Sequence, residues 1–181
     1  MKLYLWSCVC VALFVSCSSK EEQGLLRLYK NNVNYHKYLQ KTEKTELKDS
    51  NSSMAIVTAT YIYTPILNRN DNRDEVFIVG VLFENSDTSK ILFNKNATSV
   101  DENEYTLTLE GKNATKVTHL NKNDSRLKNI SFITTWGEYY EVAYPHSGKI
   151  FTLVFENSKY GKQTLPFSKV SKFVYTKKGF K

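Results

Sequence analysis

The pattern of apolar and polar residues divides the chain into an apolar start, a mixed segment and a long series of short stretches. Residues 3–15 are apolar except for Ser7, and a polar segment begins at Ser18. Residues 25–48 carry apolar side chains at an irregular helical spacing, which predicts one helix or two short ones. From residue 54 onward, short alternating or continuously apolar stretches are separated by turn residues, which predicts strands.

About eight strands are expected, because turn signals recur at roughly ten-residue spacing. The segments that read as strands are 56–63, 76–83, 90–94, 105–109, 116–120, 130–136, 139–144, 149–155, 163–167 and 172–176. No helical pattern lies between them, so an antiparallel sandwich or a closed barrel is predicted instead of a parallel sheet.

Two local patterns refine this prediction. Segments 105–109 and 116–120 flank the turn sequence EGKNAT, which predicts a hairpin. Segments 81–93 and 153–167 both contain Phe-Glu-Asn-Ser between two apolar stretches, which predicts equivalent corners of two sheets.

The order of these strands, with the turn Pro-x-x-Gly from Pro145 before a late strand, resembles the immunoglobulin-like sandwich domains of small bacterial lipoproteins. The resemblance covers about residues 54–176. It implies a mainly β fold, an antiparallel immunoglobulin-like β-sandwich of about 8 strands with an N-terminal helical segment. It carries no catalytic residue to this chain.

The first residues have the layout of a secretory signal: a basic Lys2, a short apolar core and a small Ser16. The core is shorter than the roughly twenty residues that cross a bilayer. The sequence FVSC resembles a bacterial lipobox, which implies cleavage before Cys17 and acylation of its sulfur, although Phe14 stands where Leu is commonest. The alternative is a plain secretory signal that leaves an incidental thiol.

These features predict an order of segments along the chain. The expected segments are a signal peptide (1–16), a lipidated Cys with a tether (17–24), a helical segment and linker (25–50), a β-sandwich domain (54–176) and a basic tail (177–181). The Lys-rich end is typical of a protected sheet edge and is also compatible with binding lipid headgroups.

Composition narrows the chemistry. Cys8 and Cys10 leave with the signal, so no disulfide and no cysteine metal site is expected in the exported protein. The formal net charge of +7, which loses only Lys2 on cleavage, is spread without an Arg-rich stripe, so nucleic acid is not an expected partner. His36, His119 and His146 lack metal-ligand spacing, and no cofactor is predicted.

One asparagine stands out as a candidate modification site. Asn51 lies in the sequence DSNSS with Asp49 two positions before it, which resembles the extended acceptor of bacterial oligosaccharyltransferases. An exposed linker would present it to such an enzyme. The alternative is an unmodified polar hinge.

The most distinctive patch runs from residue 136 to 148, where aromatic side chains alternate with carboxylates and suit sugars or cationic ligands. The candidate binding residues are Trp136, Glu138, Tyr139, Glu141, Tyr144 and His146. The same aromatics also suit a sandwich core with a tyrosine corner. Strand alternation favours Tyr140 as core and Tyr139 as surface.

The sequence therefore predicts a bacterial cell-envelope lipoprotein, attached to the outer membrane through Cys17, that is not an enzyme. Its expected role is binding or scaffolding at the membrane surface, with an envelope protein or a glycan as partner. Two alternatives stay open: a carrier of an apolar ligand inside a β-barrel, and a hydrolase of envelope glycans that uses Glu138, Glu141 and His146.

Overall fold

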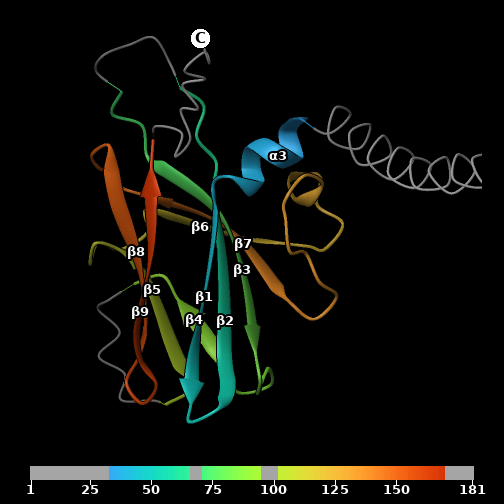
Figure 1. The fold of residues 1–181 in the computed structure, drawn as a ribbon. Coiled ribbons are helices and arrows are strands. Elements are labelled where there is room, and N and C mark those ends of the chain that lie inside the picture. Colours follow the sequence, from blue (N-terminus) through green and yellow to red (C-terminus); the bar gives the residue numbers. More distant parts are fainter. Residues whose placement is uncertain (1–32, 66–70, 95–101, 170–181) are drawn as a thin grey trace, which may run out of the picture. The chain divides into compact units, whose positions relative to one another are not determined.

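Strands dominate the computed structural model, which describes residues 33–65, 71–94 and 102–169 (Figure 1). The described elements are helix α3 (Val33–Leu39), strands β1 (Thr42–Asp49), β2 (Ser52–Tyr61), β3 (Glu75–Phe83), β4 (Lys90–Leu92), β5 (Glu104–Leu109) and β6 (Lys116–Leu120), the 3-10 helix η1 (Ser125–Leu127), and strands β7 (Glu138–Tyr144), β8 (Ile150–Asn157) and β9 (Gly161–Ser168). Residue contacts divide the chain into two units, Met1–His36 and Lys37–Lys181. All of the described strands belong to the second unit.

The nine described strands form two sheets. One has the order β1-β2-β3-β7-β6 and the other β4-β5-β8-β9. Every pair of neighbours is antiparallel except β4 and β5, which are parallel. The mainly β prediction is confirmed. The parallel pair was not predicted; it is short, because β4 has only three residues.

The core lies between the two sheets. Alternation along β3 and β7 turns Phe77 and Tyr144 inward, with their ring centroids 6.0 Å apart. Phe77 also meets Phe151 and Phe167 of the other sheet, at 6.1 and 5.1 Å. The Tyr144 hydroxyl donates to the carbonyl of Leu107 at 2.7 Å, across the two sheets. Tyr144 thus fills the core and keeps its polar end satisfied.

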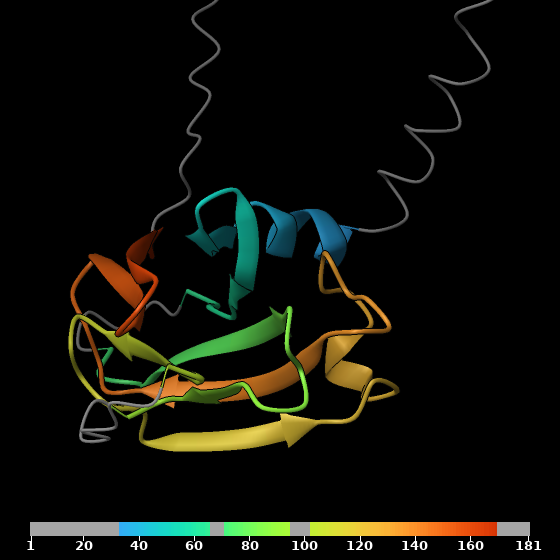
Figure 2. The same ribbon diagram turned by 90° about the horizontal axis from the view of Figure 1, so that it is seen from below.

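A second apolar cluster lies on the outer face of the five-stranded sheet. The segment between β6 and β7 folds back and places Leu127 and Ile130 on Ile78 and Tyr139. Figure 2 shows this segment, with η1, on the side of the molecule away from β9. Both faces of the sheet are therefore covered at this end.

The prediction of helix across 25–48 is wrong from Thr42 onward. Helix α3 ends at Leu39, residues 25–32 lie outside the described part, and Thr42–Asp49 is the edge strand β1. Its Lys and Glu residues favour a helix in isolation, but β1 pairs with β2 over its whole length, and tertiary pairing overrides local preference. The β-structure thus begins before residue 54.

One predicted strand and one predicted hairpin are also wrong. Segment 130–136 is a loop, because its apolar side chains cap the second cluster instead of joining a ladder. The predicted hairpin of 105–109 and 116–120 does not form, since β5 lies in the four-stranded sheet and β6 in the five-stranded one. Segment 172–176 lies outside the described residues.

The two Phe-Glu-Asn-Ser segments are not equivalent corners. The first crosses from β3 in one sheet to β4 in the other, whereas the second is the β8–β9 hairpin. In that hairpin the Asn157 side-chain oxygen accepts from the backbone of Lys159 and Tyr160, as expected for a turn asparagine. Its amide also donates to the carbonyls of Glu102 and Glu104, so the turn is tied to β5.

Candidate functional site

The most distinctive surface feature is a groove on the outer face of the five-stranded sheet. Its volume is about 170 Å³. Its floor follows one cross-strand row, in which Lys44 pairs with Thr58, Thr58 with Gly80, and Gly80 with Tyr139. The lining residues are Lys44, Ile56, Thr58, Gly80, Val81, Leu82, Phe132, Thr134, Gly137 and Tyr139.

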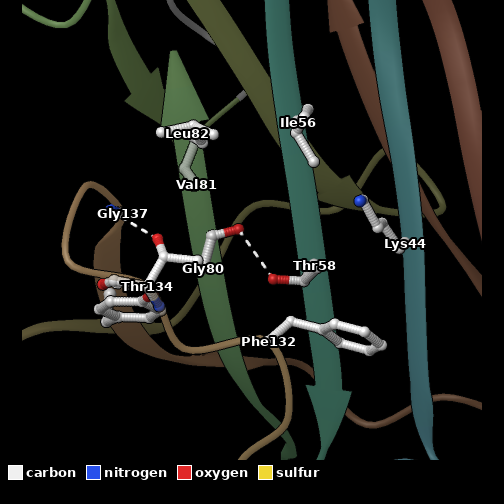
Figure 3. Close-up of a pocket in the computed structure, with 10 residues that line it drawn as sticks. Lys44, Ile56, Thr58, Gly80, Val81, Leu82, Phe132, Thr134 and Gly137 are labelled. Carbon is white, nitrogen blue, oxygen red and sulfur yellow. Dashed lines mark hydrogen bonds between the residues drawn. The ribbon is translucent and has the colours of Figure 1, made fainter.

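One wall of the groove is residues 131–137, which we call the aromatic loop. Figure 3 shows Phe132 reaching from this loop across β2 toward β1, with Ile56 and Lys44 facing the same space. Phe132 is 56% exposed, and Trp136 in the same loop is 81% exposed. These are the two most exposed aromatic side chains among the exposed large apolar residues of the described part. Exposing two rings so close together in the chain forgoes the free energy that their burial would give.

The aromatic loop is held in place by Tyr139. Its hydroxyl accepts from the backbone N–H of Thr134 at 2.6 Å and donates to the Thr134 carbonyl at 3.2 Å. The Thr134 hydroxyl accepts from the Gly137 N–H at 3.1 Å, and the Lys122 ammonium donates to the carbonyl of Thr135. The loop is thus fixed before any ligand arrives.

Two glycines allow Tyr139 to take this position. A Cβ on Gly80 would lie 2.8 Å from the Tyr139 ring, and a Cβ on Gly137 would lie 2.7 Å from its hydroxyl. A lone glycine inside an apolar strand indicates a close approach of this kind, so Gly80 was a sequence signal for the groove. Segment 76–83 was instead interpreted only as a buried strand.

The loop also stores backbone strain. Phe132 has φ +64°, a left-handed conformation that bulky residues rarely adopt and that costs about 1–3 kcal/mol. The neighbouring Ser131 hydroxyl is buried and has no hydrogen-bond partner within the described residues. The strained backbone of Phe132, its exposed ring and the unsatisfied hydroxyl of Ser131 each reduce the stability of the fold. Such features concentrate at functional sites.

The structure does not gather the six predicted patch residues into one surface. Tyr139 and Tyr144 are buried. Glu138 accepts from the Tyr140 hydroxyl at 2.6 Å, and Glu141 pairs with Arg126 at 3.1 Å. Of the six, only Trp136 belongs to the aromatic loop.

The assignment of Tyr139 to the surface was wrong for a specific reason. Alternation does place it on the outer face, but the segment between β6 and β7 covers that face. Tyr140, predicted as core, is half-buried and packs against the main core.

His146 lies at the opposite end of β7, in a polar cluster around the buried Glu75. The Glu75 carboxylate accepts from the Tyr61 hydroxyl, from Lys169 Nζ at 2.6 Å and from the Ser147 N–H at 2.9 Å, and His146 Nδ1 lies 3.4 Å from it. Burial, with the hydrogen bond to Glu75, raises the pKa of Tyr61.

The three residues considered for a hydrolase, Glu138, Glu141 and His146, do not converge. His146 Nδ1 faces Glu75 and the carbonyl of Arg73, and the hydroxyl of the neighbouring Ser147 donates to Glu110 at 3.1 Å. Glu138 and Glu141 point to opposite faces of β7 and are engaged by different partners. Within the described residues no group of three or more His, Cys, Asp or Glu side chains is placed to hold a metal ion.

The two modification sites have different positions. Asn51 is exposed in the two-residue turn between β1 and β2, next to Ser50 with φ +52°, so a tight hairpin replaces the expected linker. Cys17 lies outside the described residues. In the described part, no helix is both long enough and apolar enough to cross a bilayer.

The chain was compared with protein-family models, with curated proteins and with solved structures, and none of the three comparisons found a match. The groove and the N-terminal sequence are therefore the features from which a function can be inferred.

Proposed function

We propose that this chain is a lipid-anchored bacterial envelope protein that binds a component of the envelope through the groove and its aromatic loop. The observation that carries the binding role is the exposure of Phe132 and Trp136 on a loop that is strained and tied down. A loop fixed in advance loses little conformational entropy on binding, which favours affinity.

The anchor is supported by the first 17 residues, in which a basic start and an apolar core lead to Ser16 and Cys17. Two or more acyl chains on Cys17 would hold the protein firmly at the membrane, with the outer membrane as the proposed location. The basic net charge complements anionic components of an envelope.

We also propose that the two-sheet fold is of the immunoglobulin-like class. Support comes from the pairing of strands far apart in the sequence, β3 with β7 and β5 with β8, which is typical of Greek-key sandwiches. The described strands form two separate sheets with a filled core, so the geometry favours surface binding over an apolar cargo inside a closed barrel.

The anchor and the binding role are tested separately. For the anchor, the intact mass of the natural protein should show loss of residues 1–16 and a diacylglycerol-sized addition, and fractionation should place the protein in the envelope. Cys17→Ser should abolish the lipid addition and the envelope location. Retention of the apolar start would contradict the anchor.

The binding role is tested by a photo-crosslinking side chain at Trp136 in intact cells. A specific crosslinked envelope component is expected from position 136. The matched control is position 150, because Ile150 is 75% exposed on β8 of the other sheet. Equal crosslinking from both positions would refute the assignment of the groove.

A further inference from the structure

We propose that the groove binds one ring of an acidic saccharide, a sugar unit that carries a carboxylate within a longer glycan. This inference rests on the proposed function and names the chemical class of its ligand. It is drawn from the size of the groove, its aromatic wall, and a lysine that has no ion-pair partner among the described residues.

The size of the groove limits what enters it. Pockets for drug-sized ligands have volumes of about 300–1,000 Å³. The groove measures about 170 Å³ and is open to solvent along the sheet face. It therefore accommodates a single ring of a longer molecule, and the rest of that molecule runs over the surface toward the exposed Trp136.

The aromatic wall suits a sugar ring. One face of a pyranose carries C–H groups, which stack on an aromatic ring, while its hydroxyls need hydrogen-bond partners nearby. Phe132 offers its ring along the wall, and Thr58 and Thr134 line the same space. The Thr58 hydroxyl donates to the Gly80 carbonyl and can still accept, and the Thr134 hydroxyl accepts from the Gly137 N–H and can still donate. The space above Gly80 is taken by the Tyr139 ring, which forms part of the groove lining.

The charge in the groove selects an acid. Lys44 is exposed at the side of the groove, and the neighbouring carboxylate on its own strand, Glu46, is already engaged by Lys48 and Ser53, each at 2.7 Å. Across the described residues, no carboxylate lies within 4.0 Å of the Lys44 ammonium. An exposed ammonium that makes no ion pair with any carboxylate of the described residues, beside an apolar wall, is complementary to a carboxylate on a ring.

A lipid surface is the competing partner for two exposed aromatic rings. Insertion into a bilayer needs apolar side chains that project from the protein. Phe132 instead lies along the sheet and closes one side of a concave site with threonine hydroxyls in it. The geometry thus favours a saccharide, and membrane insertion becomes one outcome of the test.

The test uses the full chain in phosphatidylcholine nanodiscs with Trp6→Phe, which leaves Trp136 as the single tryptophan whether or not the first residues are removed. The acidic probes are tetragalacturonate and the disaccharide of N-acetylglucosamine and N-acetylmuramic acid. The neutral probe is tetragalactose. A saturable change in Trp136 emission is expected with an acidic probe, and an affinity about tenfold weaker with the neutral one.

Three variants assign the effect to the groove. Lys44→Ala should weaken acidic binding about tenfold and remove the preference over the neutral sugar. Lys162→Ala, exposed on β9 of the other sheet and remote from the groove, is the matched control and should change nothing. Phe132→Gly should lose binding while the melting temperature stays equal or rises, because glycine adopts φ +64° without strain.

Two results would overturn the inference. One is the absence of any emission change with both acidic saccharides. The other is a blue shift in phosphatidylglycerol nanodiscs that saccharides do not alter, which would assign Trp136 to the membrane. A protein crosslinked at position 136 together with no saccharide binding would leave the proposed function intact and refute the acidic saccharide alone.

Discussion

Removal of the Lys169 side chain is expected to destabilise the two-sheet fold more than removal of a solvent-exposed charged side chain. Its Nζ lies 2.6 Å from Glu75, and the two side chains are 11% and 1% exposed. Deleting one partner of a buried ion pair costs about 3–5 kcal/mol, because the remaining charge stays buried. Glu75 retains bonds from Tyr61 and Ser147, so the lower end, about 3 kcal/mol, is expected.

The assay is urea and thermal denaturation of Lys169→Ala. A loss of about 3 kcal/mol corresponds to a fall in melting temperature of about 6–12 °C for a folded unit of this size. Lys159→Ala is the control, because its pair with Glu102 has a similar 2.7 Å geometry on the surface, with side chains 45% and 61% exposed. That change should leave the melting temperature nearly unchanged, because solvent screens an exposed ion pair.

A double variant separates the ion pair from packing. Lys169→Met keeps most of the alkyl chain, and combining it with Glu75→Gln removes both charges. The double variant should be more stable than Lys169→Met alone, since no carboxylate is then left buried. A Lys169→Ala variant as stable as Lys159→Ala would refute the view that Glu75 needs this cation.

Three further substitutions test other contacts that stabilise the fold or position the aromatic loop. Gly80→Ala should cost about 1–3 kcal/mol and change the emission of Trp136, because the added Cβ meets the Tyr139 ring at 2.8 Å; unchanged emission would contradict its role in placing the loop. Asp124→Asn should flatten the loss of stability between pH 4 and pH 2: hydrogen bonds from Arg126 lower the pKa of Asp124 from 3.8 to about 2, so its contribution is present above pH 4 and lost as it protonates. Asn157→Ala should cost about 3 kcal/mol in urea denaturation, since it leaves two carbonyls and two N–H groups of the turn without their partner.

Much of the strand pattern was readable from the sequence. Burial alternates along β8, as its side-chain periodicity indicates, whereas the continuously apolar β3 is buried along most of its length. The predicted segments for β3, β6, β7 and β8 agree with the structure within about two residues. Strand β1 was missed because it is an edge strand, and only Leu47 of its eight residues is buried. Because β1 consists largely of Lys, Glu and other polar residues, it has few of the apolar residues from which strands are predicted.

The groove was not predicted, because it is built by pairing between distant segments. Trp136 was identified from composition, but Phe132 was assigned to a strand and Lys44 to a helix. Sheet register brings Lys44 and Gly80 into one row, and register depends on which strands pair. The available clue was Gly80 in the middle of an apolar strand, where a missing side chain indicates a close neighbour.

The two apolar clusters have different roles: one stabilises the fold, and the other holds the aromatic loop. Folding relies on the large cluster sealed between the sheets, whereas the aromatic loop lies outside it and is attached mainly through Tyr139. Mutations in residues 131–137 are therefore expected to change the proposed binding surface with little effect on the main core. Such a division lets ligand preference diverge among descendants of this chain while the scaffold is inherited unchanged.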